Sequence, residues 1–402
     1  MEKSRILFVT PILGIPAVGG PELRMLNSIK AIAKSFEVFI IYVNEDQKNI
    51  KTIKKGANSC GFFFCAPKKE QKLIRSIKRR LSKWLTYLRV PSWDETSVKL
   101  IKKIAEKNCI QTCWMGYGNI STNLIAEVKN KTKLKIICDT DSVWSRFILR
   151  ELDFASPSRK QQILAEGEKK QIEETQFTKD ADLVLAVSEV DADYYKTLPS
   201  GANKVKVFPN VIDLNDYTKN VDANGTKVFQ PSILIAGSFG HYHSSMDTAA
   251  RWFLSEVFPL IKNKINNTHL YIVGRNSNTG FQSDSSRSIH VTGEVPSVLP
   301  YFFGCTVLAC PLLFESGTRF KILEAGACGI PVVSTRLGAE GLEIEPDRDF
   351  LLADKPKEMA NKICHLLESE STRKEISANL YKVIAGKYSV TALAGIAKKI
   401  LD

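Results

Sequence analysis

Short runs of apolar and β-branched residues alternate along this chain with segments of helical periodicity, and this alternation constrains the fold more than any other feature. The runs are continuously apolar, as strands are when helices cover both faces of a parallel sheet. Strands that alternate with helices in this way predict a doubly wound α/β domain. In the first half of the chain the predicted strands are residues 5–10, 37–43, 61–65, 110–114, 134–139, 182–187 and 204–208.

The second half repeats the same scheme after a segment rich in Asn, Asp and Gly, residues 209–230, which is the predicted linker. Three of its strands end in glycine, at the edge where open α/β sheets bind ligands. We therefore expect an N-terminal domain over 1–212, a C-terminal domain over 213–387, a ligand cleft between them, and a helix over 388–402 that packs on either one. The predicted strands here are residues 232–237, 269–274, 288–293, 305–311 and 331–335.

Composition narrows the class of protein. The 402 residues are 44% hydrophobic and 25% charged, typical of a globular protein, and no apolar run is long enough to span a bilayer. The strand-like start at 5–10 is unlike a secretory signal, so a cytoplasmic protein is expected. Nine cysteines occur without a CxxC pair, which favours reduced thiols over a disulfide or metal role.

The formal net charge of +13 makes nucleic acid, anionic membranes and phosphorylated ligands compatible partners. Residues 68–83 hold eight basic residues against one Glu, and apolar residues recur at helical spacing through 88. This pattern fits either a basic amphipathic helix on an anionic membrane or a helix packed on its own domain with a solvated basic face. No base-stacking motif is interleaved with it, so nucleic acid is not the expected partner.

A glycine-rich loop follows the first predicted strand. After Thr10 come Gly14, Gly19 and Gly20, and then a helix start with Pro21. Glycines before a helix N-terminus let backbone N–H groups approach a phosphate, which the helix dipole favours. The loop matches neither GxxxxGK[ST] nor GxGxxG. A phosphate-binding loop and an ordinary turn both remain open.

The stretch ESGTRFKILEAGACGIPVVST, residues 315–335, concentrates cations at a predicted helix start. Residues 316–318 lie at the expected beginning of a helix that runs to about Cys328, where the first N–H groups have no partner within the helix. Arg319 and Lys321 add two positive charges there. The combination suits a diphosphate, since Arg pairs in a bidentate manner and Lys acts as a point charge.

Further along the same helix, the carboxylate of Glu324 is placed to accept hydrogen bonds from a ribose diol. Small residues at 325–327 and Gly329 are expected to let the helix pack closely on the sheet. The alternative is a surface charge pair on an ordinary helix. That alternative does not explain why small residues and charges are combined here.

The same stretch, extended to ESGTRFKILEAGACGIPVVSTRLGAEGLEI, resembles the family 4 glycosyltransferases of GT-B fold, in the branch with a GTR-x-K motif. Other segments stand in the family's order and cover most of the chain, with residues 44–110 least assignable. The C-terminal motifs are specific and the N-terminal ones are generic. The similar segments are ADLVLAVSEVDADY, VKVFPNVIDLNDY, AGSFGHYHSSMDTAARWF, HLYIVGRN and HVTGEVPSVLPYFFGCTVLACPL.

The resemblance implies two Rossmann-like domains facing each other across a cleft, with the acceptor on the N-terminal side and the nucleotide sugar on the C-terminal side. It implies a retaining, metal-independent hexosyltransferase in polysaccharide biosynthesis that needs no cofactor. The donor is a nucleotide sugar, for which UDP is favoured over GDP without being fixed by the sequence. A glycan or lipid-linked acceptor would fit, at the inner membrane face through the basic segment 68–88. The alternatives are a sugar-nucleotide epimerase of the same fold and a non-catalytic protein that binds nucleotide sugars or anionic surfaces.

The resemblance also assigns residues by position. Glu324 would hold the donor ribose, and the diphosphate would lie on the helix start. The catalytic set it implies is Arg319, Lys321 and Asp141. The residues expected to line the donor are Gly19, Gly20, Gly237, Ser238, His243, Gly293, Val295, Gly317, Thr318, Arg319, Lys321, Leu323 and Glu324.

Two departures from the family pattern bear on this site. The family has a second glutamate eight residues before Glu324, where this chain has Ser316, and Glu315 is one position off. The loop GSFGHYHSSMD lacks the usual Arg and Lys, so we expect Arg319 and Lys321 to replace those charges. In the same loop, His241 and His243 either assist as donors or are loop histidines without a ligand.

The sequence CDTDSVW places Asp139 and Asp141 after the fifth predicted strand in a DxD pattern. Such a pattern holds a metal in glycosyltransferases of the other fold class, GT-A, but no metal is expected here. One of the two aspartates is expected either to contact the acceptor or donor sugar, or to cap a helix beginning near Ser142.

Overall fold

The computed structural model describes residues 3–46, 49–67, 93–218, 226–240, 244–283 and 288–402. The predicted basic helix over 68–88, together with His241 and His243, lies outside the described residues. The chain divides into two compact units. Unit 1 comprises Met1–Asp141, Lys170–Phe208 and Ala394–Asp402, and unit 2 comprises Ser142–Lys169 and Pro209–Leu393. The predicted domain boundaries at 212 and 387 stay a prediction.

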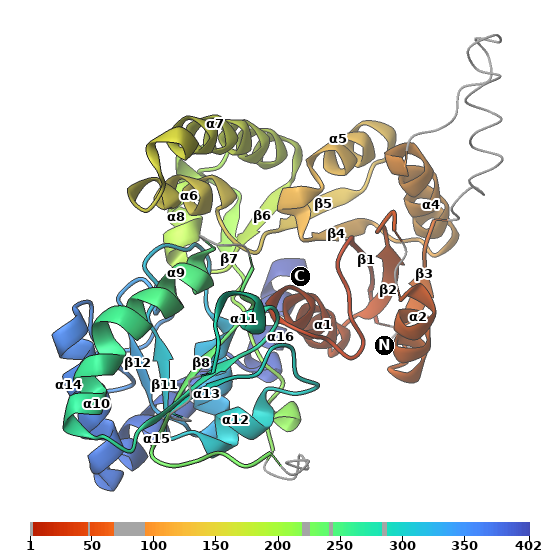
Figure 1. The fold of residues 1–402 in the computed structure, drawn as a ribbon. Helices are drawn as coiled ribbons and strands as arrows, with labels where there is room; N and C mark the ends of the chain where they lie inside the picture. Colours follow the sequence, from red (N-terminus) through yellow and green to blue (C-terminus); the bar gives the residue numbers. More distant parts are fainter. Residues whose placement is uncertain (1–2, 47–48, 68–92, 219–225, 241–243, 284–287) are drawn as a thin grey trace. The chain divides into compact units, whose positions relative to one another are not determined.

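Unit 1 is built on a parallel seven-stranded sheet of order β3-β2-β1-β4-β5-β6-β7 (Figure 1). The order reverses between β1 and β4, as in a doubly wound sheet. All seven strands predicted for the first half of the chain are confirmed, and the five central strands are buried at every residue after the first. The strands are β1 (Arg5–Thr10), β2 (Glu37–Tyr42), β3 (Phe63–Cys65), β4 (Thr112–Gly116), β5 (Lys135–Asp139), β6 (Leu183–Ala186) and β7 (Val205–Val207).

Helices cover both faces of this sheet. In Figure 1, α1 and α2 lie on one side and α4 and α5 on the other, as right-handed crossovers on either side of the reversal require. The helices formed by the N-terminal two hundred residues are α1 (Gly20–Ala33), α2 (Ile50–Ser59), α4 (Trp93–Lys107), η1 (Gly118–Ile120), α5 (Thr122–Lys131), α6 (Trp144–Arg150), η2 (Glu151–Asp153), α7 (Pro157–Asp180) and α8 (Glu189–Thr197). Of these, α6, η2 and the first part of α7 are grouped with unit 2.

Unit 2 holds a second parallel sheet, of order β10-β9-β8-β11-β12-β13. The five strands predicted for the second half are confirmed. The short edge strand β13 was not predicted, because two residues leave no periodicity to detect. The strands are β8 (Ser232–Ala236), β9 (His269–Val273), β10 (Ile289–Val291), β11 (Val307–Cys310), β12 (Val332–Ser334) and β13 (Leu351–Leu352). Two doubly wound α/β domains were therefore predicted correctly.

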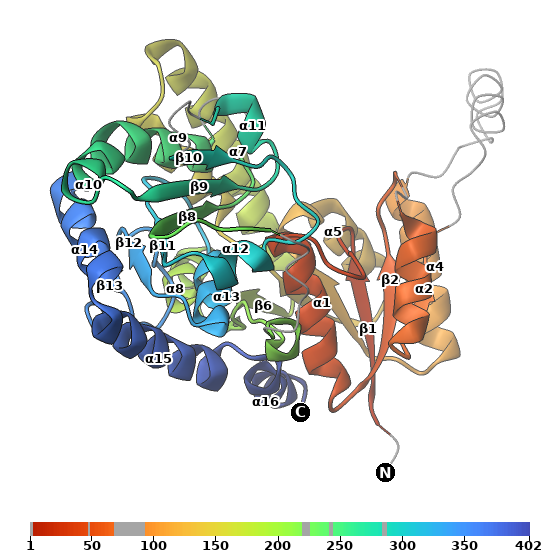
Figure 2. The same ribbon diagram turned by 60° about the horizontal axis from the view of Figure 1, so that its bottom comes forward.

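The helices of unit 2 also form two layers. Figure 2 shows α9, α10 and α14 along one face of the sheet and α12 and α13 on the other. The predicted C-terminal helix is confirmed as α16. The helices after residue 209 are η3 (Leu214–Asp216), α9 (Ser245–Trp252), the π-helical turn η4 (Phe253–Val257), α10 (Phe258–Lys264), α11 (Ser277–Gly280), α12 (Leu299–Gly304), α13 (Phe320–Cys328), α14 (Pro356–Glu368), α15 (Glu370–Lys387) and α16 (Val390–Leu401). Most of α16, from Ala394 on, is grouped with unit 1.

A small residue in helix α13 allows close packing against a neighbouring helix. A Cβ atom added at Gly326 would lie 2.5 Å from Cγ1 of Ile384 and 3.0 Å from Cγ of Leu380, both on α15. Gly329 ends α13 with a φ of 71°, a left-handed conformation that glycine adopts at low cost. At Gly326, the expectation of close packing on the sheet is thus corrected to close packing on α15.

All nine cysteines are free thiols in this structure. Five are buried, whereas Cys60 and Cys109 are exposed. Among the helices of the described part of the chain, we find none with the length and apolarity needed to cross a bilayer.

Candidate functional site

The carboxyl ends of the three strands β8, β9 and β10 meet through their glycines. The Gly274 N–H donates to the carbonyl of Gly293 at 3.1 Å, and a Cβ added at Gly274 would overlap the carbonyl of Gly237. Gly274 and Gly293 have φ values of 130° and 70°, which suit glycine. The predicted grouping of these strand ends at one edge is therefore present in unit 2.

The segment before α13 is a turn rather than the first turn of the helix. Gly317 has a φ of 76° and Arg319 is extended, so the helix begins at Phe320, slightly later than predicted. Among the described residues, none accepts a hydrogen bond from the backbone N–H groups of Gly317, Thr318, Phe320 or Lys321. Four N–H donors beside a helix N-terminus make a site suited to an anion.

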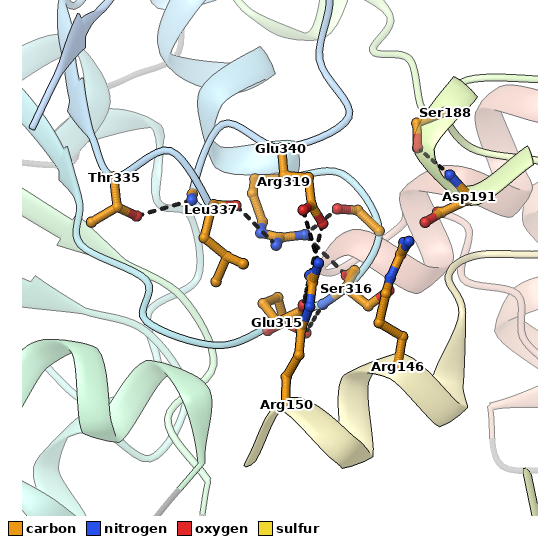
Figure 3. Close-up of polar contacts among 12 residues, drawn as sticks. Arg146, Arg150, Ser188, Asp191, Glu315, Ser316, Arg319, Thr335, Leu337 and Glu340 are labelled. Carbon is orange, nitrogen blue, oxygen red and sulfur yellow. Dashed lines mark hydrogen bonds and ion pairs between the residues drawn. The ribbon is translucent and has the colours of Figure 1, made fainter. Parts of the chain in front are cut away.

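The Arg319 side chain turns into the protein. It is buried and donates to the carbonyls of Ser316, at 2.9 Å, of Gly317, and of Leu337, at 3.3 Å (Figure 3). The guanidinium therefore holds the turn before α13 in shape. Whether it also contacts a diphosphate, as predicted, stays a prediction.

Lys321 places a positive charge beside Gly237, at the sheet edge where the ends of β8, β9 and β10 meet. Its Nζ lies 2.7 Å from Sδ of Met246, a weak acceptor, and 3.2 Å from where a Cβ on Gly237 would lie. In the described parts of the chain no carboxylate forms an ion pair with it. Burial lowers the pKa of Lys321, and the charge of Arg319 adds to this effect. An anion bound here would supply the missing counter-charge.

Glu324, one turn after Lys321, is held by a residue of the predicted linker. The Tyr217 hydroxyl donates to Oε1 of Glu324 at 3.2 Å. Burial raises the pKa of Glu324 to about 7, and Tyr217 and Lys321 offset only part of that effect. Burial, together with the carboxylate of Glu324, also raises the pKa of Tyr217.

A pH test follows from the raised pKa of Glu324. The folded protein holds this proton more tightly than the unfolded chain between pH 4.5 and about 7, so the contribution of Glu324 to the free energy of unfolding falls as pH rises through that window. We expect Glu324→Gln to remove this loss. Its stability relative to wild type should rise by on the order of 1–3 kcal/mol from pH 5 to pH 8. Parallel curves of melting temperature against pH would contradict this.

Two further side chains fix the same turn. Asn210 is buried and donates through Nδ2 to Oγ1 of Thr318 at 2.8 Å. The Ser245 hydroxyl, at the start of α9, donates to Oε2 of Glu315 at 2.7 Å. Sequence reasoning missed Asn210, Tyr217, Ser245 and Met246 as partners, although the linker and the strand–helix segment that carry them were both quoted as resemblances.

The other donor-side residues occupy different environments. Ser238 is exposed after β8, and Val295 packs partly buried against the core beyond Gly293. The Gly293 N–H donates to the Ser277 hydroxyl at 2.9 Å. Leu323 is fully buried in the hydrophobic core, so its side chain offers no surface to a ligand.

The predicted residues of unit 1 form separate local structures. Gly19 has a φ of 89° and precedes α1, and Gly20 is the first residue of that helix. The Glu22 carboxylate, in the first turn, accepts a hydrogen bond from the Val18 N–H at 2.6 Å. The loop thus supplies its own negative group at this helix start, and its role beside a transferring sugar stays a prediction.

Asp139 and Asp141 have different partners. Asp139 is buried, forms an ion pair with Arg24 and accepts from Nε1 of Trp114 at 3.0 Å. Asp141 accepts from Nδ2 of Asn119. Helix α6 begins at Trp144, and its N-cap residue Val143 makes no side-chain cap. Capping of this helix by Asp141 and sugar contact by Asp141 both stay predictions.

Unit 1 has a cavity of about 610 Å³ where β1 and β2 end. Carboxylates line much of its wall, and Lys170 is the basic residue in the lining, paired with Glu173 at 2.5 Å. The lining consists of Pro11, Val43, Asn44, Glu45, Asp46, Asp94, Ile120, Ser121, Thr122, Asn123, Leu124, Lys170 and Glu173. Over the residues that the structure describes, no group of three His, Cys, Asp or Glu side chains is arranged to hold a metal.

Residues 230–369 match the family described as Glycosyl transferases group 1. The match contains the whole six-stranded sheet, α13 and the unpartnered N–H groups. This segment therefore belongs to a glycosyltransferase family, which confirms the resemblance predicted from the sequence. None of the curated proteins matches the chain.

Solved structures of similar fold extend over the whole chain. HepE from Anabaena, in complex with UDP and glucose, has a TM-score of 0.64 at 13% identity and covers 99% of each chain. Sucrose-phosphate synthase from Thermosynechococcus elongatus has a TM-score of 0.66 at 16% identity, over 99% of this chain and 98% of that one. A glycosyltransferase from Rickettsia africae has a TM-score of 0.66 at 16% identity over 100% of both. The GT-B fold is confirmed.

Proposed function

We propose that this chain is a retaining, metal-independent glycosyltransferase that moves a hexose from a nucleoside diphosphate donor to a glycan or lipid-linked acceptor. The observation that carries the proposal is the anion site at the start of α13. Four N–H groups without acceptors and the ammonium of Lys321 lie together at the ligand-binding edge of the sheet. They belong to the segment that matches the glycosyltransferase family.

Other residues at the same edge of the sheet indicate which kind of donor binds there. Gly237, Gly274 and Gly293 let the loops after β8, β9 and β10 pack closely on neighbouring residues, and Glu324 offers a carboxylate to a ribose diol. HepE, which shares the fold, has been solved in complex with UDP-glucose. These points favour a UDP-sugar as the donor.

Retention follows a front-face path in this proposal. The acceptor hydroxyl attacks the anomeric carbon from the side of the leaving group, and the bond from that carbon to the phosphate oxygen breaks. The phosphate oxygen takes the hydroxyl proton. The N–H groups and Lys321 stabilise the negative charge that the departing diphosphate gains. This electrostatic stabilisation of the transition state is the protein's main contribution to the rate.

The acceptor is proposed to bind unit 1, in the cavity lined by Asn44, Asp94 and Asn123. Carboxylate and amide oxygens accept hydrogen bonds from sugar hydroxyls. This lining therefore fits a glycan better than an aromatic or aliphatic acceptor.

The proposal predicts selective stabilisation by nucleotides. We expect UDP and a UDP-sugar to raise the melting temperature in the presence of EDTA, since no metal is required. A nucleotide at about 100 times its Kd stabilises by ~2.7 kcal/mol, which is a shift of several degrees. The measurement is a thermal-shift series over UDP, GDP, ADP and their sugars.

Glu324→Ala serves as the site control and should lose most of the shift. If no nucleotide stabilises the wild type, the donor assignment is wrong. Stabilisation that disappears with EDTA would contradict metal independence. Release of epimerised sugar without an acceptor would favour the epimerase instead.

A further inference from the structure

Helix α6, which lies in sequence between strands β5 and β6 of the first sheet, packs on the turn before α13. Phe147, on α6, and Phe154, just after η2, both stack on Phe314, with ring centroids 6.5 and 5.2 Å apart. Phe314 is buried and directly precedes Glu315. The segment 144–154 is therefore anchored to the residues that lead into the anion site.

Arg150, the last residue of α6, binds the same turn by hydrogen bonds. Its Nη1 donates to the Glu315 carbonyl at 2.6 Å and to Oε1 of Glu340 at 2.7 Å, and its Nη2 donates to Oε2 of Glu340 at 2.9 Å (Figure 3). The side chains are 27% and 22% exposed, so the pair is largely shielded. A parallel fork of this kind fixes orientation as well as charge.

The ionisation of Glu340 agrees with this geometry. Burial would raise the pKa of Glu340, but the hydrogen bonds and the charge of Arg150 outweigh it, so the pKa lies below the usual value. Glu340 therefore stays a carboxylate around neutral pH and keeps the guanidinium in place.

Other contacts leave the turn little freedom. The Arg146 guanidinium lies 3.3–3.4 Å from Oγ of Ser316, again from α6. The Arg319 guanidinium donates hydrogen bonds to the carbonyls of Ser316 and Gly317. The turn is thus fixed by α6 and by Arg319, and both act on the backbone that carries the unpartnered N–H groups.

We propose that Arg150 and Glu340 are positioning residues of the donor site: by fixing the Glu315 carbonyl, they set where the N–H groups of residues 317–321 stand for a nucleoside diphosphate. The inference rests on the proposed function. Neither residue touches the donor in this scheme. A displacement of about 1 Å in a binding or catalytic geometry can cost ~10²-fold in rate, so loosening the turn is enough to matter.

The test compares two fork-type ion pairs of unit 2. Arg150→Met and Glu340→Gln break the pair at the turn, and Arg150→Lys keeps the charge but cannot form the fork. The matched control is Arg348→Met, which breaks a fork with Asp349 at 2.9 and 3.1 Å. Each variant is measured for UDP affinity, for KM and kcat with a UDP-sugar, and for amide hydrogen exchange over residues 315–321 without ligand.

We expect Arg150→Met and Glu340→Gln to weaken UDP binding and raise KM about tenfold, with faster amide exchange over 315–321. A tenfold effect is below the ~10²-fold cost of a displacement of about 1 Å. Arg150→Lys should restore part of both, and Arg348→Met should change neither. Unchanged exchange and affinity in Arg150→Met would overturn the inference. If wild type binds no nucleotide, the proposed function fails, while faster exchange confined to Arg150→Met and Glu340→Gln would still support positioning of the turn.

Discussion

Replacing Lys321 with methionine is expected to lower the rate of sugar transfer by about 10²–10³-fold, the usual cost of removing one group that stabilises charge developing in the transition state. The ammonium lies beside Gly237 and the sulfur of Met246, and within the described residues it has no carboxylate partner. It is therefore available to a bound anion. Methionine keeps the length and fills the space next to Met246, so the fold should be retained.

The measurement is the release of nucleoside diphosphate from the sugar donor, with and without acceptor, at saturating donor. The matched control is Lys262→Met, because Lys262 is also partly buried, lies on α10, and donates to the carbonyls of Asn266 and Thr268. A turnover rate in Lys321→Met equal to that of wild type would contradict the assignment of the anion site. Arg319 is a poor second probe, since its loss releases three backbone carbonyls and disturbs the turn itself.

The strands could be predicted because their signal is local. A run such as RILFVT is apolar throughout, and every residue of β1 after Arg5 is buried. The positions of the strand-end glycines were predicted for the same reason, since parallel strands bring their carboxyl ends to one edge. Local pattern and tertiary burial agree in these elements.

The start of α13 shows where local pattern fails. Residues 316–318 look like a helix start, yet Gly317 takes a left-handed φ and Arg319 an extended conformation. The deciding contacts are those of Arg319 with carbonyls on both sides of the turn, including Leu337. A sequence pattern of charges shows that cations gather here, but not which of them points inward.

The partners of the site were beyond sequence reasoning because they come from distant segments. Arg150 is 165 residues from Glu315 and 190 from Glu340, and Tyr217 is 107 residues from Glu324. No periodicity or spacing connects such pairs. They depend on how α6 and the linker pack on the rest of unit 2, which only the folded chain determines.

Unit 1 has its own stability test in the buried pair of Arg24 and Asp139. Both side chains are almost fully inaccessible, and Arg24 also donates to the carbonyl of Phe208, at 3.3 Å from both terminal nitrogens. Removing one partner leaves an uncompensated buried charge. We therefore expect Arg24→Met to lower the free energy of unfolding by about 3–5 kcal/mol.

Replacing both partners distinguishes two contributions to the free energy of unfolding: the destabilisation by an unpaired buried charge and the net stabilisation by the intact ion pair. Arg24→Met combined with Asp139→Leu should recover much of the loss, because two apolar side chains need no counter-charge. Recovery should stay incomplete, since Nε1 of Trp114 and the Phe208 carbonyl lose their partners. The measurement is urea unfolding followed by circular dichroism for wild type, both single variants and the double variant.

The matched control in unit 1 is the exposed pair of Lys129 and Asp182, whose side chains are 43% and 36% exposed. Lys129→Met should cost no more than about 1 kcal/mol, because water screens that pair. A loss in Arg24→Met as small as in Lys129→Met would mean that water reaches Asp139 once Arg24 is gone. A double variant no more stable than Arg24→Met would mean that the hydrogen bonds to Trp114 and Phe208, rather than the buried charge, dominate the stability of this core.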